Sequence, residues 1–128
     1  MSKQRTIIST DKAPAAIGPY SQAVKVGGTV YLSGQIALDP QTKEMIAGDV
    51  VVQANQVFKN LQAVSEAAGG SLDDAVKVNI SLTDLNDFSR VNDVMKTFFR
   101  EPYPARACVQ VAALPRGAAV EVEVILEL

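Results

Sequence analysis

The residues of this sequence that could do chemistry are concentrated in the segment 104–111. The segment follows a predicted helix and alternates like a β-strand, so Arg106, Cys108 and Gln110 are expected on one face. Arginine carries a planar set of N–H donors that matches a carboxylate or a phosphate with two parallel hydrogen bonds. The segment therefore suggests a small acid bound by Arg106. The other face would carry small apolar residues suited to a core, namely Ala105, Ala107, Val109 and Val111.

A simpler alternative is that Arg106 only pairs with a nearby glutamate on a solvated sheet face. Isolated charged residues in strands usually lie at the surface, which favours this alternative when spacing alone is considered. Glu121 and Glu123 alternate with valines in the predicted strand 120–126, so either could be that partner. Either could also act as a general base. The spacing leaves both possibilities open.

A hairpin centred on Pro115 and Arg116 would pair the last two predicted strands. It would place Gln110 opposite Glu121, and Arg106 would then lie roughly 13 Å along the strand at about 3.3 Å per residue. Cys108 would lie opposite Glu123 in the same register. A gap of this size suits Arg106 and Glu121 flanking a small molecule, or serving different subunits, better than a direct pair.

Cys108 is the only cysteine, and the chain contains no histidine. Relays of the Ser-His and Cys-His types and histidine-ligated metals are therefore excluded. As a nucleophile, Cys108 would need a neighbour that lowers its pKa, and Arg106 is the only obvious cation. A half-buried structural cysteine is the better interpretation. No set of carboxylates has the spacing of a metal site, so no metal is expected.

Two further candidate groups lie at predicted turns. Tyr20 follows Gly18 and Pro19 directly, so a stiff turn would orient its ring, although a core or rim aromatic is an equally good interpretation. Ser33 and Gly34 end the second strand of a predicted hairpin around a Gly-Gly turn. A glycine at this position lets the backbone approach a ligand or another backbone closely.

The hydrophobic periodicity predicts strands, two helices and a final hairpin. The first helix begins at the N-cap Asp49 and ends at Gly69, and the second begins near Asn86 and ends before Pro102. Asn92 borders the apolar face of the second helix and could cap, bridge to a loop or face a site. The strands are expected at 5–9, 23–26, 29–33, 75–82, 104–111 and 120–126.

Two amphipathic helices can cover only one face of so wide a sheet. The other face would then be polar, and a solvated antiparallel sheet would explain that pattern. If the registers hold, this face carries Lys77, Asn79, Ser81, Arg106, Cys108, Gln110, Glu121 and Glu123.

Length and composition indicate an ordinary globular protein. A chain of 128 residues is long enough for one domain, expected to span 1–128, with its own core. The net charge is −2 and no basic stripe is visible, so a nucleic-acid groove is not expected. The single cysteine fits a reducing compartment. The N-terminus lacks the apolar run of a signal peptide and no run has membrane-spanning length, so a cytoplasmic location is expected.

A series of motifs runs along the whole chain, at residues 16–22, 31–36, 84–88, 91–92, 104–109, 114–115 and 120–123. In residues and in order, this series resembles the YjgF/RidA family. The resemblance implies an α/β (α+β) fold of the chorismate-mutase-like type, with one mixed sheet and two helices packed on one face. It also implies a homotrimer with clefts between subunits, which would explain a polar sheet face better than solvent does.

The resemblance also implies an activity that uses no cofactor. The archetypal members are 2-iminobutanoate/2-iminopropanoate deaminases, which hydrolyse the reactive enamines and imines made by pyridoxal-phosphate-dependent dehydratases to 2-oxo acids and ammonia. Their carboxylate-binding arginine falls on Arg106. Glu121 and the carbonyl of Cys108 would hold the attacking water, and Glu121 would pass its proton toward the departing ammonia. The other pocket residues fall on Tyr20, Ser33, Gly34 and Asn92.

Two alternatives accompany this interpretation. The first is a trimer that binds small metabolites for regulation without significant turnover, since fold does not fix function. The second is a ribonuclease, an older label in the family, which the acidic balance and the missing histidine oppose. The segment 100–104 is short compared with some relatives, so the rim of the cleft and the preferred substrate side chain are expected to differ.

Overall fold

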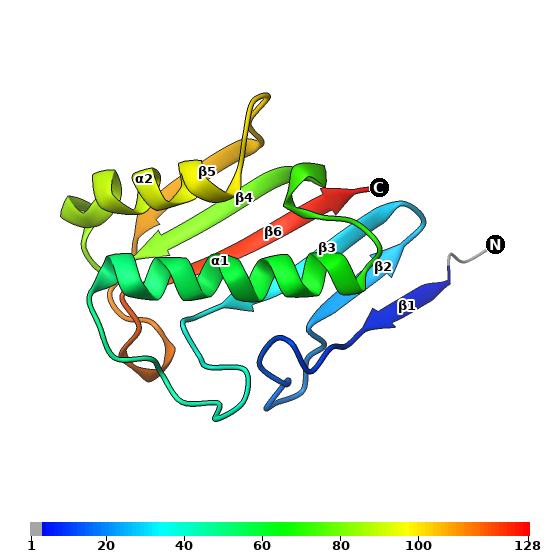
Figure 1. Ribbon diagram of the computed structural model, residues 1–128, viewed down its shortest axis with the longest axis horizontal. Coiled ribbons are helices and arrows are strands. Elements are labelled where there is room, and N and C mark those ends of the chain that lie inside the picture. The colour runs from blue at the N-terminus through cyan, green and yellow to red at the C-terminus, as the bar shows by residue number, and fades with distance from the viewer. Residues whose placement is uncertain (1–3) are drawn as a thin grey trace.

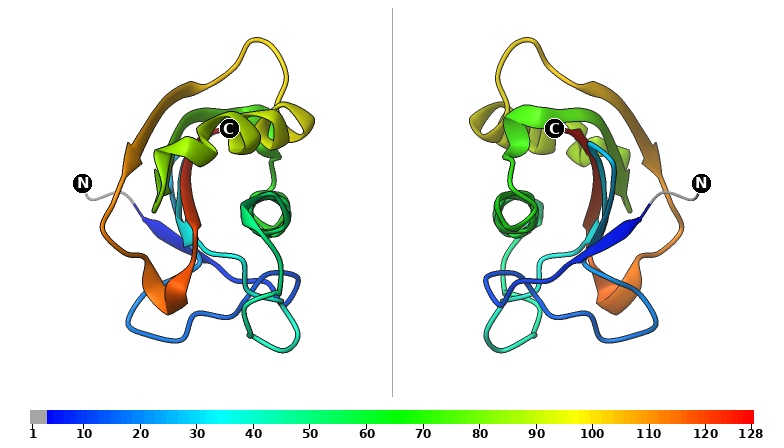
Figure 2. Two further views of the ribbon diagram at one scale, coloured as in Figure 1. Left: turned by 90° about the vertical axis from the view of Figure 1, so that its left-hand side faces the viewer. Right: turned by 90° about the vertical axis from the view of Figure 1, so that its right-hand side faces the viewer.

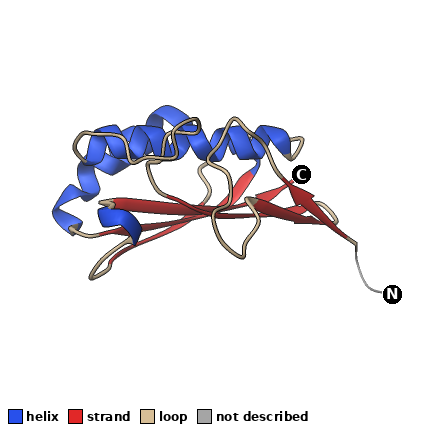
Figure 3. Cartoon of the chain, turned by 90° about the horizontal axis from the view of Figure 1, so that it is seen from below, coloured by secondary structure: helices blue, strands red, loops and turns tan. Residues whose placement is uncertain are grey.

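Six strands form one mixed β-sheet, and two helices cover one of its faces (Figures 1 and 3). The computed structural model describes residues 4–128. The strand order is β1-β2-β3-β6-β4-β5, with β4 and β5 parallel and every other neighbouring pair antiparallel. The predicted mixed sheet with two helices on one face is confirmed. The elements are β1 (Arg5–Ile8), β2 (Ala23–Val26), β3 (Thr29–Gln35), α1 (Val50–Ala67), β4 (Ala75–Leu82), α2 (Phe88–Phe98), β5 (Ala105–Gln110) and β6 (Val120–Glu127), with short 3-10 turns at Leu72–Asp74, Leu85–Asp87 and Pro115–Gly117.

Helix α1 begins and ends where its sequence signals predict. The Asp49 side chain accepts hydrogen bonds from the backbone N–H groups of Val51 and Val52 at 3.0 and 3.1 Å. After the C-cap Ala68, Gly69 takes a φ of +95°, a left-handed conformation in which a side chain would be strained. These caps satisfy backbone groups that the helix itself cannot.

The core lies between the helices and the sheet (Figure 2). Phe58 on α1 is fully buried and packs against the rings of Phe98 and Phe99, with ring centroids 5.4 and 5.6 Å away. The apolar stripe of α1 meets the alternating valines of β6, the central strand next to β4. The residues that fill this layer include Val57, Leu61, Val64, Val78, Leu82, Val120, Val122, Val124 and Leu126.

The predicted hairpin between the last two strands is wrong. Strand β5 does not pair with β6 but lies parallel to β4 at the edge of the sheet, so Cys108 pairs with Ile80 rather than with Glu123. Gln110 pairs with Leu82 for the same reason. Helix α2 connects β4 to β5, and such a crossover makes the two strands parallel. Strand β6 then occupies the other edge of β4, between β4 and β3.

This pairing also reverses the expected faces of β5. Arg106 and Cys108 lie level with Val78 and Ile80, which are buried beneath the helices, so both side chains face the helices. Gln110, which is paired with the buried Leu82, lies on the same face of β5 as Arg106 and Cys108. The apolar residues of β5 instead lie on the open face, where Val109 is 51% exposed. The expectation that Lys77, Asn79, Ser81, Glu121 and Glu123 share the open face holds.

Candidate functional site

Arg106 lies in a cavity of about 410 Å³ between α2 and the segment that leads into β5. Two lining residues, Arg106 and Lys96, carry a positive charge. In the described part of the chain, no acidic residue lines the cavity, so it favours an anion. The lining is Asn92, Met95, Lys96, Tyr103, Pro104 and Arg106.

The guanidinium group of Arg106 is held by three residues of α2. Its Nη1 donates a hydrogen bond to Oδ1 of Asn92 at 2.5 Å and contacts Sδ of Met95 at 3.7 Å. Its central carbon lies 5.0 Å from the centre of the Phe88 ring, a cation–π distance. Asn92, predicted to border the apolar face of the helix, thus faces the site.

Arg106 has no carboxylate partner within residues 4–128. The alternative in which it only pairs with a glutamate of the same sheet is therefore not what the structure shows. Arginine has five N–H donors, and those that Asn92 and Met95 leave open can receive a carboxylate from outside the chain. The ion pairs of the described chain join Arg90 to Asp49 and Asp87, and Arg100 to Asp73.

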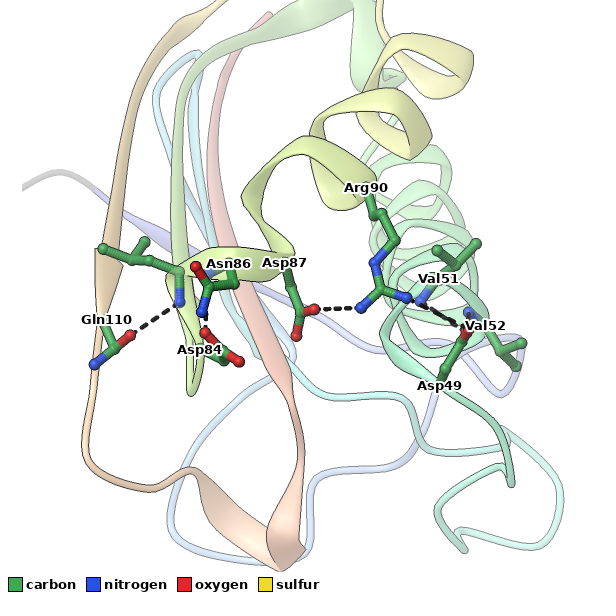
Figure 4. A network of polar contacts seen from close by, with 9 residues as sticks. Asp49, Val51, Val52, Asp84, Asn86, Asp87, Arg90 and Gln110 are labelled. Atoms are coloured by element: carbon green, nitrogen blue, oxygen red, sulfur yellow. Dashed lines mark hydrogen bonds and ion pairs between the residues drawn. The ribbon is translucent and has the colours of Figure 1, made fainter.

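A polar network fixes the start of α2 relative to β5 and α1 (Figure 4). Oε1 of Gln110, near the end of β5, accepts a hydrogen bond from the backbone N–H of Leu85 at 2.9 Å. Arg90 on α2 contacts Asp87 and also Oδ2 of Asp49, the N-cap of α1, at 3.8 Å. The helix that holds Arg106 is thus tied to the strand that carries Arg106.

Cys108 is half-buried and packs against the core below α2. Burial raises the pKa of its thiol, and the nearby charge of Arg106 only partly opposes this. The thiol is therefore kept in its neutral form, which is a poor nucleophile. This agrees with the structural interpretation of the side chain.

The backbone N–H and C=O of Cys108 are better placed than its thiol to contact a ligand or a water molecule. The N–H of Val111 donates to the carbonyl of Leu82 at 2.8 Å, so residue 111 points its backbone groups at β4. Because successive residues of a strand point these groups to opposite sides, those of Cys108 point away from β4. Strand β5 is an edge strand, so within residues 4–128 no further strand covers the N–H and C=O of Cys108.

A second cavity, of about 370 Å³, brings together four other predicted site residues. Tyr20, Ser33, Gly34 and Glu121 all line it. Arg116, whose Nη1 donates to the carbonyl of Lys43 at 3.1 Å, is also in the lining, as is Glu123. The two cavities share no lining residue.

Glu121 is half-buried in this second cavity. Burial raises the pKa of its carboxyl group, and the like charge of Glu123 raises it further. Glu123 itself accepts a hydrogen bond from Nδ2 of Asn79 at 3.1 Å. A carboxyl group with a raised pKa is a stronger base when ionised and suits general acid–base catalysis.

Gly34 allows Glu121 to occupy its position. The pairing of β3 with β6 shifts register between Leu32 and Gln35, and Gly34 lies within this irregularity. A Cβ atom at Gly34 would lie 3.1 Å from Cδ and 3.3 Å from Cγ of Glu121, closer than side chains normally pack. The glycine therefore accommodates a neighbouring carboxylate side chain, whereas the sequence predicted a close approach to a ligand or to another backbone.

Tyr20 and Ser33 are positioned by the loop that precedes β2. Oγ of Ser33 donates to the carbonyl of Ser21 at 2.6 Å. The buried side chain of Gln22, which the sequence analysis did not single out, holds the loop by donating to the carbonyls of Thr10 and Pro14 at 3.0 and 2.8 Å. Tyr20 is 50% exposed, so its ring lines the cavity rather than the core.

The predicted site residues are thus divided into two groups. Arg106 and Asn92 lie on the helical side, whereas Glu121 lies on the open face. Cys108 is in the lining of neither cavity. Phe88 and Met95, which also contact Arg106, were not predicted as site residues, although their helical spacing from Asn92 was a usable signal.

Two structural features are not found within residues 4–128. No group of three or more histidine, cysteine, aspartate or glutamate side chains is arranged to hold a metal ion. Neither described helix is both long and apolar enough to span a bilayer.

The chain is similar in sequence to known proteins over most of its length. The sequence matches the family described as "Endoribonuclease L-PSP" over residues 10–128. A protein of Dermatophagoides farinae named 2-iminobutanoate/2-iminopropanoate deaminase is 56% identical over 126 residues, which cover 98% of each chain. A mouse protein of the same name is 54% identical over 121 residues, which cover 94% of this chain and 90% of the mouse protein.

A solved structure agrees with the fold in detail. The crystal structure of RidA from the Antarctic bacterium Psychrobacter sp. PAMC 21119 superposes with a TM-score of 0.93 and 61% sequence identity, covering 96% of this chain and 99% of that one. The mixed sheet covered by two helices thus places this chain in a class of small α+β proteins. Within that class, this chain is a member of the RidA/YjgF family, as its motifs predict.

Proposed function

We propose that this chain is a hydrolase that converts reactive 2-imino acids and their enamine forms to 2-oxo acids and ammonia. The single observation that carries the proposal is that Arg106 is oriented in a cavity but has no anionic partner in the described part of the chain. Its guanidinium is oriented by Asn92 in a cavity without acidic lining, and within residues 4–128 it lacks a carboxylate partner. The names of the mouse and Dermatophagoides farinae relatives supply the reaction class.

The residue types suggest how the reaction proceeds. Arg106 binds the substrate carboxylate, which fixes the position of the C2 imine carbon. A protonated imine is already electrophilic, so a water molecule held by Glu121 and the carbonyl of Cys108 adds to C2 while Glu121 accepts its proton. Glu121 then returns that proton to the nitrogen and takes the proton of the new C2 hydroxyl as the C–N bond breaks, so the C2 carbonyl forms and ammonia leaves. The proton on Glu121 finally passes to the released ammonia, which departs as ammonium. Tyr20, Ser33, Gly34 and Asn92 complete the pocket.

We further propose that the working unit is a homotrimer of the chorismate-mutase-like type, with each site shared by two chains. Two observations support this. The open face of the sheet exposes large apolar side chains on β1, β3 and β5, with Ile7 57%, Tyr31 52% and Val109 51% exposed, and contact with another chain would bury them. Arg106 and Glu121 also face opposite sides of the sheet, so a second chain is needed to bring them together.

A coupled assay tests the activity. A threonine dehydratase generates 2-aminocrotonate in situ, and the release of 2-oxobutanoate is followed with and without the protein. The wild type is expected to accelerate release and Arg106→Ala to lose the acceleration. Arg100→Ala is the matched control, because Arg100 pairs with Asp73 away from both cavities. No acceleration by the wild type with several imines would refute the proposal and favour a metabolite-binding trimer.

The remaining sequence-based expectations are unchanged. A cytoplasmic location, the absence of a nucleic-acid partner and activity without a cofactor stay predictions. Small 2-imino and 2-oxo acids are the partners that the proposed reaction requires.

A further inference from the structure

Three residues of α2 that contact Arg106 lie on one line of the helix. Phe88, Asn92 and Met95 are spaced i, i+4 and i+7, which places them on the same face over successive turns. That face is turned toward Arg106 on β5. The helix thus presents a ring face, an amide oxygen and a thioether sulfur to one guanidinium group.

These contacts use the donors of Arg106 unequally. Both contacts with hydrogen-bond acceptors, Oδ1 of Asn92 and Sδ of Met95, involve the same nitrogen, Nη1. A guanidinium group has two N–H bonds on Nη1, two on Nη2 and one on Nε. Within residues 4–128, the hydrogen bonds of the side chain thus leave the edge formed by Nε and Nη2 open, while the central carbon of the guanidinium group lies over the Phe88 ring.

We propose that Phe88 and Met95 are positioning residues for Arg106, and that together with Asn92 they direct its Nε–Nη2 edge to the substrate carboxylate. The inference rests on the proposed function for the identity of the ligand. A carboxylate can bind a guanidinium group through either of two edges, by Nη1 and Nη2 or by Nε and Nη2, with two parallel hydrogen bonds each. Occupation of Nη1 by α2 leaves the second edge as the one that binds.

Helix α2, which makes these contacts with Arg106, is held by core packing and by a hydrogen bond to β5. Phe88 is half-buried and packs against the main core. Met95 is buried, with 4% of its surface exposed. The hydrogen bond from Leu85 to Gln110 ties the turn before α2 to β5 itself, only four residues from Arg106. The ring and the sulfur are therefore positioned independently of any ligand, so they can orient the arginine before substrate arrives.

Fluorinated phenylalanines at position 88 test the role of the ring. Stepwise fluorination removes the negative charge of the ring face with little change in shape, so it weakens a cation–π contact while leaving packing nearly intact. From phenylalanine to pentafluorophenylalanine, the dissociation constant of 2-oxobutanoate should rise progressively, by about 2–5-fold in total. The same series at Phe99, which packs edge-on against Phe58, is the control and should leave it unchanged.

The response must follow the number of fluorines to support the proposal. Equal dissociation constants across the series at Phe88, or the same trend at Phe99, would overturn the role of the ring. Should the pentafluoro variant not fold, the 4-fluoro and 3,5-difluoro variants still define the slope. Met95→Leu keeps the volume but removes the sulfur acceptor, and it is expected to weaken 2-oxobutanoate binding without lowering kcat in proportion.

Nuclear magnetic resonance of the Arg106 side chain tests the edge directly. In the free protein, the Nε–H signal of Arg106 should be narrow, because α2 holds the guanidinium group in one orientation. Exchange broadening of this signal should increase in the pentafluoro-Phe88 and Met95→Leu variants. Saturation with 2-oxobutanoate should move the Nε–H proton signal downfield, because that proton becomes a hydrogen-bond donor to a charged oxygen. A bound complex with an unmoved Nε–H signal would overturn the proposed edge.

The two readouts separate this inference from the proposed function. No binding of 2-oxobutanoate by the wild type would contradict both the proposed function and the carboxylate edge. The spectra of the free protein would still decide whether Phe88 and Met95 hold the guanidinium. Binding with the expected Nε–H shift but without turnover would support the edge and contradict the deaminase.

Discussion

Arg106 and Glu121 lie on opposite faces of the same β-sheet. Arg106 is level with the buried Val78 of β4 and faces α2, whereas Glu121 is level with Ser81 of the same strand and faces the other way. Adjacent strands place paired residues on the same side, so this relationship follows from the register rather than from side-chain rotation. The two groups required for the proposed reaction therefore cannot meet within one chain.

The close approach of Glu121 to Gly34 predicts that the substitution Gly34→Ala lowers turnover without weakening substrate binding. Gly34→Ala places a Cβ atom within 3.1 Å of the Glu121 carboxyl carbon, so the carboxylate has to move. We expect kcat to fall by about tenfold or more, as displacement of a general base reduces proton transfer. The Michaelis constant should change little, because Arg106 is untouched. Steady-state kinetics measures both.

Gly69→Ala is the matched control for that substitution. Gly69 has a φ of +95° and open space around its Cα, so an added methyl group meets backbone strain but no neighbour. We expect a loss of about 1 kcal/mol in the free energy of unfolding and no change in kcat. A fall in kcat of equal size in both variants would refute the positioning role of Gly34.

The environment of Glu121 predicts the direction of a pH effect. Only the ionised carboxylate can accept a proton from water, and burial together with Glu123 raises its pKa. The acid limb of the kcat/KM profile should therefore lie at higher pH than for an ordinary glutamate. Glu123→Gln removes the like charge, so the Glu121 pKa falls and the limb should move to lower pH. A pH profile of the 2-aminocrotonate reaction measures this.

Glu127→Gln provides the comparison on the same strand. Glu127 is exposed and accepts a hydrogen bond from Thr29, outside both cavities. Its replacement should leave the acid limb in place. An acid limb that moves to higher pH in Glu123→Gln, or equally in both variants, would show that Glu121 does not control it.

The half-buried thiol of Cys108 predicts that its replacement has a mild effect on activity. Its pKa is raised by burial, so little thiolate is present at neutral pH, and the contribution of the residue is assigned to its backbone. Cys108→Ser keeps the backbone and should retain kcat/KM within a few-fold. In the wild type, iodoacetamide should cause slow inactivation at most. A loss of activity as large as that of Glu121→Gln would instead indicate nucleophilic catalysis by the thiol.

Local signals predict the elements of the fold well. Asp49 and Gly69 mark the ends of α1, and the clean alternation from Ala75 to Leu82 defines β4 residue for residue. These signals depend only on neighbouring residues. Some residues of the family's motifs also line the two cavities, among them Tyr20, Asn92, Arg106 and Glu121, whereas Met95 and Lys96 lie outside the motifs.

The arrangement of β5 could not be read from the sequence in the same way. The alternation along β5 places Arg106 and Ala107 on opposite faces of the strand. It does not say which of the two faces is turned toward the core, because the strand lies at an edge of the sheet and buries little of its surface. Strand pairing is a long-range property, and here the crossover through α2 decides it. The division of the site into two cavities follows from that pairing, so the sequence could not predict this division either.

Mixed oligomers of two inactive variants test the central claim, that each site combines Arg106 of one chain with Glu121 of another. Arg106→Ala and Glu121→Gln are purified separately and then reassembled together at equal amounts. Random assembly gives about one quarter of the sites an intact arginine and an intact glutamate, so about a quarter of wild-type activity should return. Each variant reassembled alone is the control and should stay inactive. Mixtures that are no more active than the separate variants, although they contain both chains, would contradict a shared site.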